Sequence, residues 1–247
     1  MKALMAAVRS IARTGIVRAG ALLVCLCALV LPQTAALATP ASATAAATPV
    51  ILIYGDSLSA EYGLARGTGW AALLDARLKE KRLAFTVTNA SISGETTSGG
   101  AARIDAALKQ HKPAVVIVEL GGNDGLRGLA LEATRANLAR MITASQKSGA
   151  RVVLAGMQLP PNYGRSYTDG FRNAYGELAK QHKAALVPFF LEGVADKRAL
   201  FQADGIHPTQ AAQARLLDNV WPVLLPLLTA KPLASPAMKS KTTSTAR

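Results

Sequence analysis

Cysteine is almost absent from this chain of 247 residues, because Cys25 and Cys27 are the only two. Both lie inside one apolar run near the N-terminus, from Ala19 to Leu31. Once that run is removed, neither a disulfide nor a thiol remains, which excludes a disulfide-held scaffold and cysteine chemistry. Histidine is also scarce, with three residues far apart in sequence and no metal-ligand spacing. We therefore expect no metal and no other cofactor.

Long apolar runs are missing as well. The run from Ala19 to Leu31 has about 13 residues, too few to cross roughly 30 Å of hydrocarbon comfortably as a helix. Basic residues precede it and Ala36-Leu37-Ala38 follows it, so the sequence predicts a signal peptide over residues 1–38, cleaved near Ala38, and export to the periplasm or the medium. No stable membrane insertion is expected after cleavage. An uncleaved anchor is the alternative, whereas Val24 and Leu26 before the cysteines disfavour lipid attachment.

Acidic residues are absent from both ends of the chain, although the formal net charge is +13. Eight basic residues stand in these two terminal segments, which leaves +5 for the rest of the chain. That excess is mild, and no stretch interleaves basic and aromatic residues, so no nucleic-acid partner is expected. The eight residues are Lys2, Arg9, Arg13, Arg18, Lys231, Lys239, Lys241 and Arg247.

Two segments lack the apolar residues that a core needs. Residues 39–48 are almost entirely Ala, Thr, Pro and Ser, and residues 230–247 are rich in Pro, Ser, Thr and Lys. We expect a linker over 39–48, a disordered basic tail over 230–247, and one folded domain over 49–229. A tail that binds anionic lipid or cell-wall polymer is the alternative. The sequence does not predict the oligomeric state.

Short apolar runs alternate with longer helical patterns across the predicted domain. Five of the runs have the length and composition of buried parallel strands. This alternation predicts a three-layer α/β/α fold, with a five-stranded parallel sheet and helices on both faces. Ligands bind such sheets beyond the carboxyl ends of the strands, so we expect the chemistry in the loops that follow them. The five runs are Val50–Tyr54, Ala84–Asn89, Ala114–Leu120, Val152–Met157 and Ala184–Phe189.

The first strand is followed by Gly55-Asp56-Ser57-Leu58-Ser59. A serine in this position would present its hydroxyl at the carboxyl edge of the strand, near backbone N–H groups of the following turn. Gly-Asp-Ser is also a common turn and helix cap, and that reading stays open for this segment alone. Ser57 is the candidate nucleophile.

A serine nucleophile needs a base, and His207 is the best placed of the histidines. His111 and His182 stand at the ends of helical patterns and are expected to be solvated. His207 lies in a loop of turn formers, Ala203 to Pro208, before the final helix. Asp204 precedes it by three residues, so its carboxylate can reach Nδ1 and leave Nε2 free as the base. Taken alone, the segment is also compatible with a loop aspartate and a capping histidine.

Two more loops offer donors for the oxyanion of a tetrahedral intermediate. The segment after the second strand contains Gly94, whose backbone N–H could approach a ligand closely. The segment after the third strand contains Asn123, whose carboxamide could point into the same crevice. Each segment by itself is a Gly-rich turn with a polar side chain.

Together, the segments Gly-Asp-Ser-Leu-Ser, Ser-Gly-Glu-Thr-Thr, Gly-Gly-Asn-Asp and Asp-Gly-Ile-His-Pro, in this order, resemble the motifs of the SGNH/GDSL hydrolases. The resemblance covers residues 49–229 and is closest to the periplasmic branch of acyl-CoA thioesterases I, lysophospholipases and arylesterases. It implies the flavodoxin-like SGNH hydrolase fold and a catalytic triad of Ser57, Asp204 and His207.

The same resemblance implies the members of the oxyanion hole. These are the backbone N–H groups of Ser57 and Gly94 and the carboxamide of Asn123. Asp56 and Asp124 belong to the same motifs, and we interpret them as residues that hold the loops.

The predicted function is hydrolysis of carboxylic esters and thioesters through an acyl-enzyme, with aryl esters, acyl-CoA-type thioesters and lysophospholipids as substrates. Leu126, Leu159 and Tyr163, in loops after the third and fourth strands, are expected to contact the acyl chain. Two alternatives keep the same fold: an acetyl esterase acting on carbohydrate, and a non-catalytic periplasmic binding module. The sequence does not identify the physiological substrate.

Overall fold

The computed structural model describes residues 47–230 of the chain. The predicted signal peptide, its cleavage site and both cysteines lie outside the described residues. Almost all of the predicted linker and basic tail lie outside them too. Their assignments therefore stay predictions.

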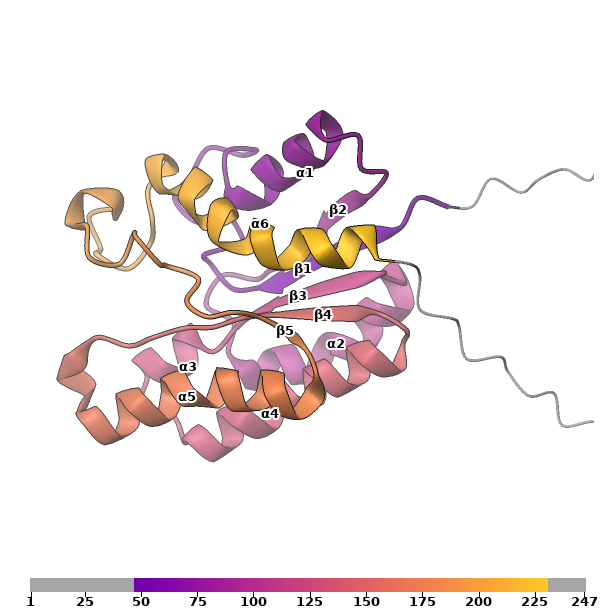
Figure 1. Ribbon diagram of the computed structural model, residues 1–247. Coiled ribbons are helices and arrows are strands. Elements are labelled where there is room, and N and C mark those ends of the chain that lie inside the picture. The colour runs from indigo at the N-terminus through magenta and orange to yellow at the C-terminus, as the bar shows by residue number, and fades with distance from the viewer. Residues whose placement is uncertain (1–46, 231–247) are drawn as a thin grey trace, which may run out of the picture. The chain divides into compact units, whose positions relative to one another are not determined.

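Five parallel strands form one sheet in the order β2-β1-β3-β4-β5 (Figure 1). This is the strand order of flavodoxin-like doubly wound folds. The predicted fold class is confirmed, and each predicted strand overlaps an observed one. The strands are β1 (Val50–Gly55), β2 (Thr86–Asn89), β3 (Val115–Glu119), β4 (Arg151–Ala155) and β5 (Ala185–Val187).

Helices cover both faces of the sheet (Figure 1). Helices α1 and α6 pack together on one face, and α2, α4 and α5 cover the other. Within residues 47–230, no helix is both long and apolar enough to span a membrane. The helices are α1 (Trp70–Glu80), α2 (Thr97–His111), α3 (Gly122–Leu126), α4 (Leu131–Lys147), α5 (Arg165–His182) and α6 (Gln213–Thr229), with 3₁₀ turns η1 (Pro161–Tyr163), η2 (Arg198–Leu200) and η3 (Gln210–Ala212).

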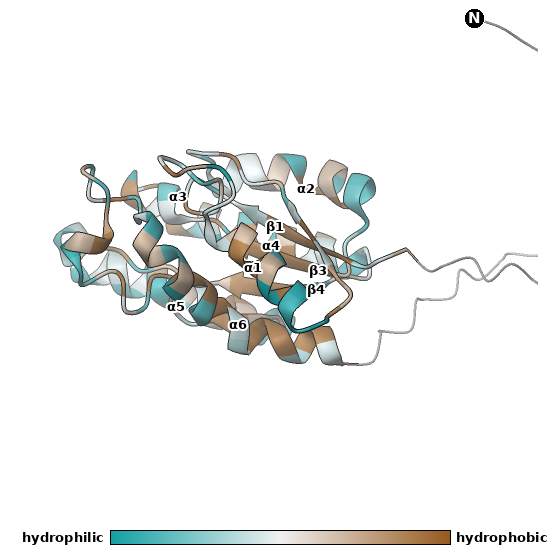
Figure 2. Ribbon diagram, turned by 90° about the horizontal axis from the view of Figure 1, so that it is seen from above, coloured by the Kyte–Doolittle hydropathy of each residue, from teal (hydrophilic) through white to brown (hydrophobic). Residues whose placement is uncertain are grey.

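The central strands are apolar along their whole length because helices bury both of their faces. All five residues of β3 are buried, as are the last five of the six residues in β1. In Figure 2, strands β3 and β4 are accordingly brown, the colour of hydrophobic residues. The edge strand β2 is partly exposed. It starts at Thr86, whereas the sequence predicted a start at Ala84. The core therefore lies around β1, β3 and β4.

The carboxyl ends of β1 and β3 lie side by side, with Gly55 paired to Glu119. From β1 the chain continues to β2 on one side of this pair, and from β3 it continues to β4 on the other. The two departing loops diverge, which opens a crevice for ligands at this point of the sheet. The segment after β3 folds at once into the short helix α3, where its glycines had predicted a turn.

Candidate active site

A tight turn directly after β1 presents Ser57. The backbone carbonyl of Asp56 accepts hydrogen bonds from the N–H groups of Ser59 and Ala60, at 3.2 and 2.9 Å. The Asp56 carboxylate closes the same turn, because its Oδ1 accepts the N–H of Leu58 at 3.0 Å. These bonds reverse the chain beyond the sheet edge and leave the Ser57 side chain only half-buried, on the wall of a pocket.

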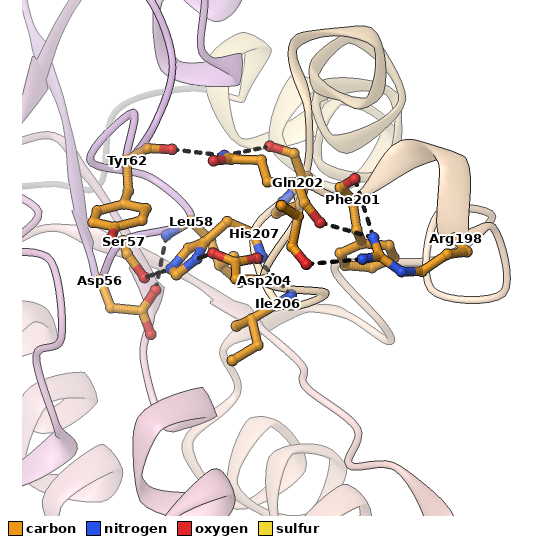
Figure 3. Close-up of polar contacts among 12 residues, drawn as sticks. Asp56, Ser57, Leu58, Tyr62, Arg198, Phe201, Gln202, Asp204, Ile206 and His207 are labelled. Atoms are coloured by element: carbon orange, nitrogen blue, oxygen red, sulfur yellow. Dashed lines mark hydrogen bonds and ion pairs between the residues drawn. The ribbon is translucent and has the colours of Figure 1, made fainter.

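The predicted base and its acid lie on one loop before α6 (Figure 3). Asp204 Oδ1 accepts the backbone N–H groups of Ile206 and His207, at 2.9 and 3.0 Å. Gly205, directly after Asp204, takes the left-handed backbone conformation. The other carboxylate oxygen, Oδ2, lies 2.6 Å from His207 Nδ1. A carboxylate three residues ahead of the histidine thus fixes both the loop and the imidazole.

The structure brings the predicted nucleophile and base together across 150 residues of sequence. His207 Nε2 lies 2.9 Å from Ser57 Oγ, a hydrogen-bonding distance. With the Nδ1 proton donated to Asp204, Nε2 carries the lone pair that can accept the serine proton. Ser57, His207 and Asp204 therefore form an unbroken relay.

Hydrogen bonding keeps Asp204 ionised. The backbone N–H of His207, then that of Ile206, then the His207 imidazole lower the pKa of the Asp204 carboxyl to about 2. A carboxyl group with a lowered pKa loses its charge only when the pH falls through that value. Asp204 is therefore a carboxylate throughout the neutral range, where it can stabilise an imidazolium on His207.

The predicted carboxamide donor Asn123 stands in the first turn of α3 and lines the same pocket as Ser57. One of its Nδ2 hydrogens is donated to Asp56 Oδ2 at 3.0 Å. The second hydrogen of the amide is available for a ligand oxygen. Burial raises the pKa of Asp56 to about 6, although the Leu58 N–H and the Asn123 amide oppose that rise. Asp56 is thus ionised at neutral pH and acts as the acceptor that orients Asn123.

Replacing this donor tests its role. Asn123→Ala is expected to lower kcat by about 100- to 1000-fold with KM changed by less than about threefold, because an oxyanion donor acts mainly in the transition state. Steady-state kinetics on p-nitrophenyl butyrate measure both constants. Asn173→Ala, an exposed asparagine on α5, is the control and should leave them unchanged. A rate for Asn123→Ala equal to that control would remove Asn123 from the oxyanion hole.

Gly94 lies on the exposed loop between β2 and α2 and takes a left-handed backbone conformation, with φ of 78°. Two bonds tie its loop to the nucleophile turn: Gly55 N–H donates to Ser91 Oγ, and Ile92 N–H donates to the Gly55 carbonyl, each at 3.0 Å. The Gly94 carbonyl accepts a bond from Arg127 at 3.2 Å. Gly94 is not among the residues that line the pocket with Ser57, so its part in an oxyanion hole stays a prediction.

A pocket of about 730 Å³ opens beside Ser57 and His207. Most of its wall is apolar, and Leu126 and Leu159 are among the lining residues. Their predicted contact with the acyl chain stays a prediction. Tyr163 does not line it; its hydroxyl instead donates to the Leu126 carbonyl at 3.0 Å. Tyr163 therefore supports the end of α3 at Leu126 and does not form the pocket wall.

Three residues around the relay were not predicted from the sequence. The ring of Tyr62 packs against the His207 imidazole at a tilt of 36°, with 4.3 Å between centroids. The Tyr62 carbonyl accepts the Gln202 amide at 2.9 Å. The Arg198 guanidinium donates to the backbone carbonyls of residues 201, 202 and 203 (Figure 3). These contacts clamp the histidine loop to the nucleophile turn and fix its outer edge. Only the nearness of Gln202 to the Asp204 motif was a signal in the sequence.

Substitution of Arg198 tests whether its contacts hold the histidine loop. Arg198→Lys keeps the charge, but one ammonium group cannot reach three carbonyls as the guanidinium does. We expect kcat to fall by about tenfold with little change in KM, because the histidine loop loses its outer support. Lys197→Gln, at the exposed neighbouring cation, is the matched control. Equal kinetics for the two variants would contradict a role of Arg198 in holding the loop.

The other two histidines lie apart from the pocket, and one differs from its prediction. His182 was expected to be solvated, but its Nε2 is buried and has no hydrogen-bond partner among the described residues. His182 is the last residue of α5, and its backbone carbonyl accepts the Gln146 amide at 2.7 Å. Within residues 47–230, no group of three or more His, Cys, Asp and Glu side chains could hold a metal ion.

Comparisons with known proteins agree with the geometry. The sequence model of the GDSL-like Lipase/Acylhydrolase family matches residues 53–215. "Esterase TesA" of Pseudomonas aeruginosa is 55% identical over 183 residues, which cover 74% of this chain and 91% of that protein. "Thioesterase 1/protease 1/lysophospholipase L1" of Escherichia coli is 44% identical and covers 74% of this chain and 87% of that protein. A crystal structure of TesA superposes with a TM-score of 0.71 at 54% identity, over 72% of this chain and 99% of that one.

Proposed function

The chain belongs to the GDSL-like lipase/acylhydrolase family, and on that premise we propose that it hydrolyses carboxylic esters and thioesters through an acyl-enzyme on Ser57. The single observation that carries the assignment of residues is the relay Ser57–His207–Asp204, with contacts of 2.9 and 2.6 Å. The two relatives described above are named esterase, thioesterase and lysophospholipase, which supports the same reaction class.

The reaction proceeds in two halves. Ser57 Oγ attacks the acyl carbonyl while His207 Nε2 takes the hydroxyl proton, and the carbonyl electrons move onto the oxygen. The Asn123 amide and backbone N–H groups receive that negative charge. As the intermediate collapses, His207 gives its proton to the leaving alkoxide or thiolate, and Ser57 stays acylated. Water then attacks with the same base, which frees the acid and restores the serine.

The pocket supports an acyl chain as the part of the substrate that is recognised. Its volume of about 730 Å³ and its predominantly apolar wall suit a chain of several carbons better than an acetyl group on a hydroxyl-rich sugar. Leu126, at the end of α3, and Leu159, in the segment after β4, both line this wall. We propose small-molecule acyl esters and thioesters as substrates, with lysophospholipids and acyl-CoA-type thioesters among them.

Hydrolysis of p-nitrophenyl esters from acetate to palmitate, with an acyl-CoA as the thioester, tests this proposal. We expect kcat/KM to rise from acetate to chains of intermediate length, as the apolar pocket fills. A maximum at acetate would favour the carbohydrate acetyl esterase. A chain inactive on every ester and thioester would be a binding module with the same fold.

We also propose that the chain is exported, with residues 1–38 removed as a signal peptide and residues 230–247 remaining as a basic tail. N-terminal sequencing of the protein recovered from the periplasmic fraction is expected to begin at Thr39. A sequence beginning at Met1 in the membrane fraction would favour the uncleaved anchor.

A further inference from the structure

A carboxyl group that takes no part in the reaction lies directly beneath the nucleophile turn. Glu119, the last residue of β3, is fully buried. Its Oε2 accepts the Ser59 hydroxyl at 2.7 Å, and that hydroxyl oxygen also receives the Trp70 indole N–H at 3.2 Å. A Cβ on Gly55 would lie 2.7 Å from the same Oε2, so the carboxyl fits closely against the end of β1. Glu119 thus touches the turn that carries Ser57 at both ends.

A second buried carboxyl, that of Asp56, lies in the same turn, and the two differ in their hydrogen bonds. Both oxygens of Asp56 accept donors, one from the Leu58 N–H and one from the Asn123 amide. Glu119 Oε1 is buried and has no hydrogen-bond partner among the described residues. An ionised carboxylate is stabilised by donors at both of its oxygens, whereas a neutral carboxylic acid carries its own hydrogen on one of them. The lack of a donor at Oε1 therefore favours the acid, with its hydrogen on Oε1 and with Oε2 accepting the Ser59 hydroxyl. Ionising both of two neighbouring buried carboxyls costs much free energy, because the two negative charges repel each other. The difference in hydrogen bonds therefore indicates that Asp56 carries the charge.

We propose that Glu119 is a positioning residue that remains a neutral carboxylic acid, supporting the Ser57 turn through Ser59 while Asp56 keeps the single negative charge that orients Asn123. This inference rests on the proposed function for its catalytic meaning. It gives Glu119 a role in aligning both the nucleophile and the oxyanion donor without contact with the substrate.

Electrostatics point the same way. Burial, and then the nearby charge of Asp56, raise the pKa of Glu119 well above its usual range, although the Ser59 hydroxyl and the Asp56 backbone N–H oppose the rise. The titratable groups that face the pair are Asp124 from α3, the phenol of Tyr175 from α5 and the imidazole of His207. Tyr175 is itself kept neutral by burial, and from α1 the facing group is the uncharged Trp70 indole. No cation among these described groups contacts Glu119 to favour its ionised form.

The catalytic role is tested by comparing Glu119→Leu with Glu119→Gln. Leucine removes the bond to Ser59, so kcat is expected to fall by about 10- to 100-fold with KM changed by less than about threefold. Glutamine is neutral and offers an oxygen to Ser59 in the same place, so it should recover most of the lost kcat. If glutamine were as damaging as leucine, a carboxylate would be required and the proposal would be wrong.

The protonation state is tested without any activity, so the result stands apart from the proposed function. In the infrared difference spectrum of wild type minus Glu119→Gln at pH about 8, we expect the carbonyl band of a protonated carboxyl group. Carboxylate bands in its place would overturn the proposal.

Denaturant unfolding is a second test of the protonation state of Glu119, and it needs no catalytic activity, so it also applies to a variant that is poorly active. A raised folded-state pKa makes the wild type lose stability as the pH rises from about 5 to about 8, and glutamine removes that loss. The denaturant concentration at the unfolding midpoint of Glu119→Gln, minus that of the wild type, should therefore increase as the pH rises over this interval. A difference that stays constant or shrinks would show that Glu119 is ionised in the folded protein.

Discussion

Ser57→Ala is expected to lower kcat/KM on p-nitrophenyl butyrate by about 10⁵-fold or more, because the members of a catalytic triad act as a unit. The residual rate would come from the pocket and the oxyanion donors alone. The half-buried Ser57 side chain would lose its hydrogen bond to His207 Nε2, which lies at the edge of the pocket, so thermal unfolding should change little. Spectrophotometric assays of wild type and variant, prepared side by side, measure the effect.

Two controls make that result decisive. Ser166→Ala, at an exposed serine on α5, should keep the wild-type rate and so exclude a general effect of mutation or preparation. A fluorescent phosphonate, which reacts with activated serines, should label wild type and Ser166→Ala but not Ser57→Ala. Labelling or turnover that persists in Ser57→Ala would mean that another residue is the nucleophile.

The layers of the fold could be predicted because they depend on residue patterns that are local in sequence. The run from Val115 to Glu119 is apolar at four of its five positions, and only a strand covered on both faces needs such a run. The contact of Asp204 with His207 is local in the same sense, since three residues on a turn determine it. The contact of Ser57 with His207 spans 150 residues and followed only from the expected strand order and the family resemblance.

Other parts of the site depend on packing between distant loops, which no single segment encodes. The Tyr62 ring contacts the His207 imidazole, and the Gln202 amide donates to the Tyr62 carbonyl across 140 residues of sequence. Neither contact can be predicted from the residues next to Tyr62 or Gln202 alone. In the sequence, Glu119 is only the one acidic residue of the predicted strand Ala114–Leu120. Its complete burial beside Asp56 becomes visible once β1 and β3 are paired. For Tyr163, the sequence suggested contact with the substrate because the residue follows β4 in a loop. In the structure its hydroxyl donates to the Leu126 carbonyl and so supports the chain there.

The two roles of Asp204 separate in a single substitution. Asp204→Asn can keep the loop, because its amide oxygen can still accept the backbone N–H groups of Ile206 and His207 in place of Oδ1. The amide nitrogen then occupies the position of Oδ2, 2.6 Å from His207 Nδ1, and offers a hydrogen where the aspartate offered an acceptor. The imidazole must turn to the tautomer with its proton on Nε2, facing Ser57. That tautomer cannot take the serine proton.

We therefore expect Asp204→Asn to lower kcat by about 10⁴-fold near neutral pH while the protein stays folded. Asp204→Ala, which also loses the loop acceptor, should be at least as inactive and should in addition lower the melting temperature. Because the pKa of Asp204 is lowered to about 2, the wild type should show no loss of activity from this group above pH about 4. Full activity in Asp204→Asn would mean that the carboxylate only shapes the loop, and that the charge beside His207 contributes nothing to the transfer of the serine proton.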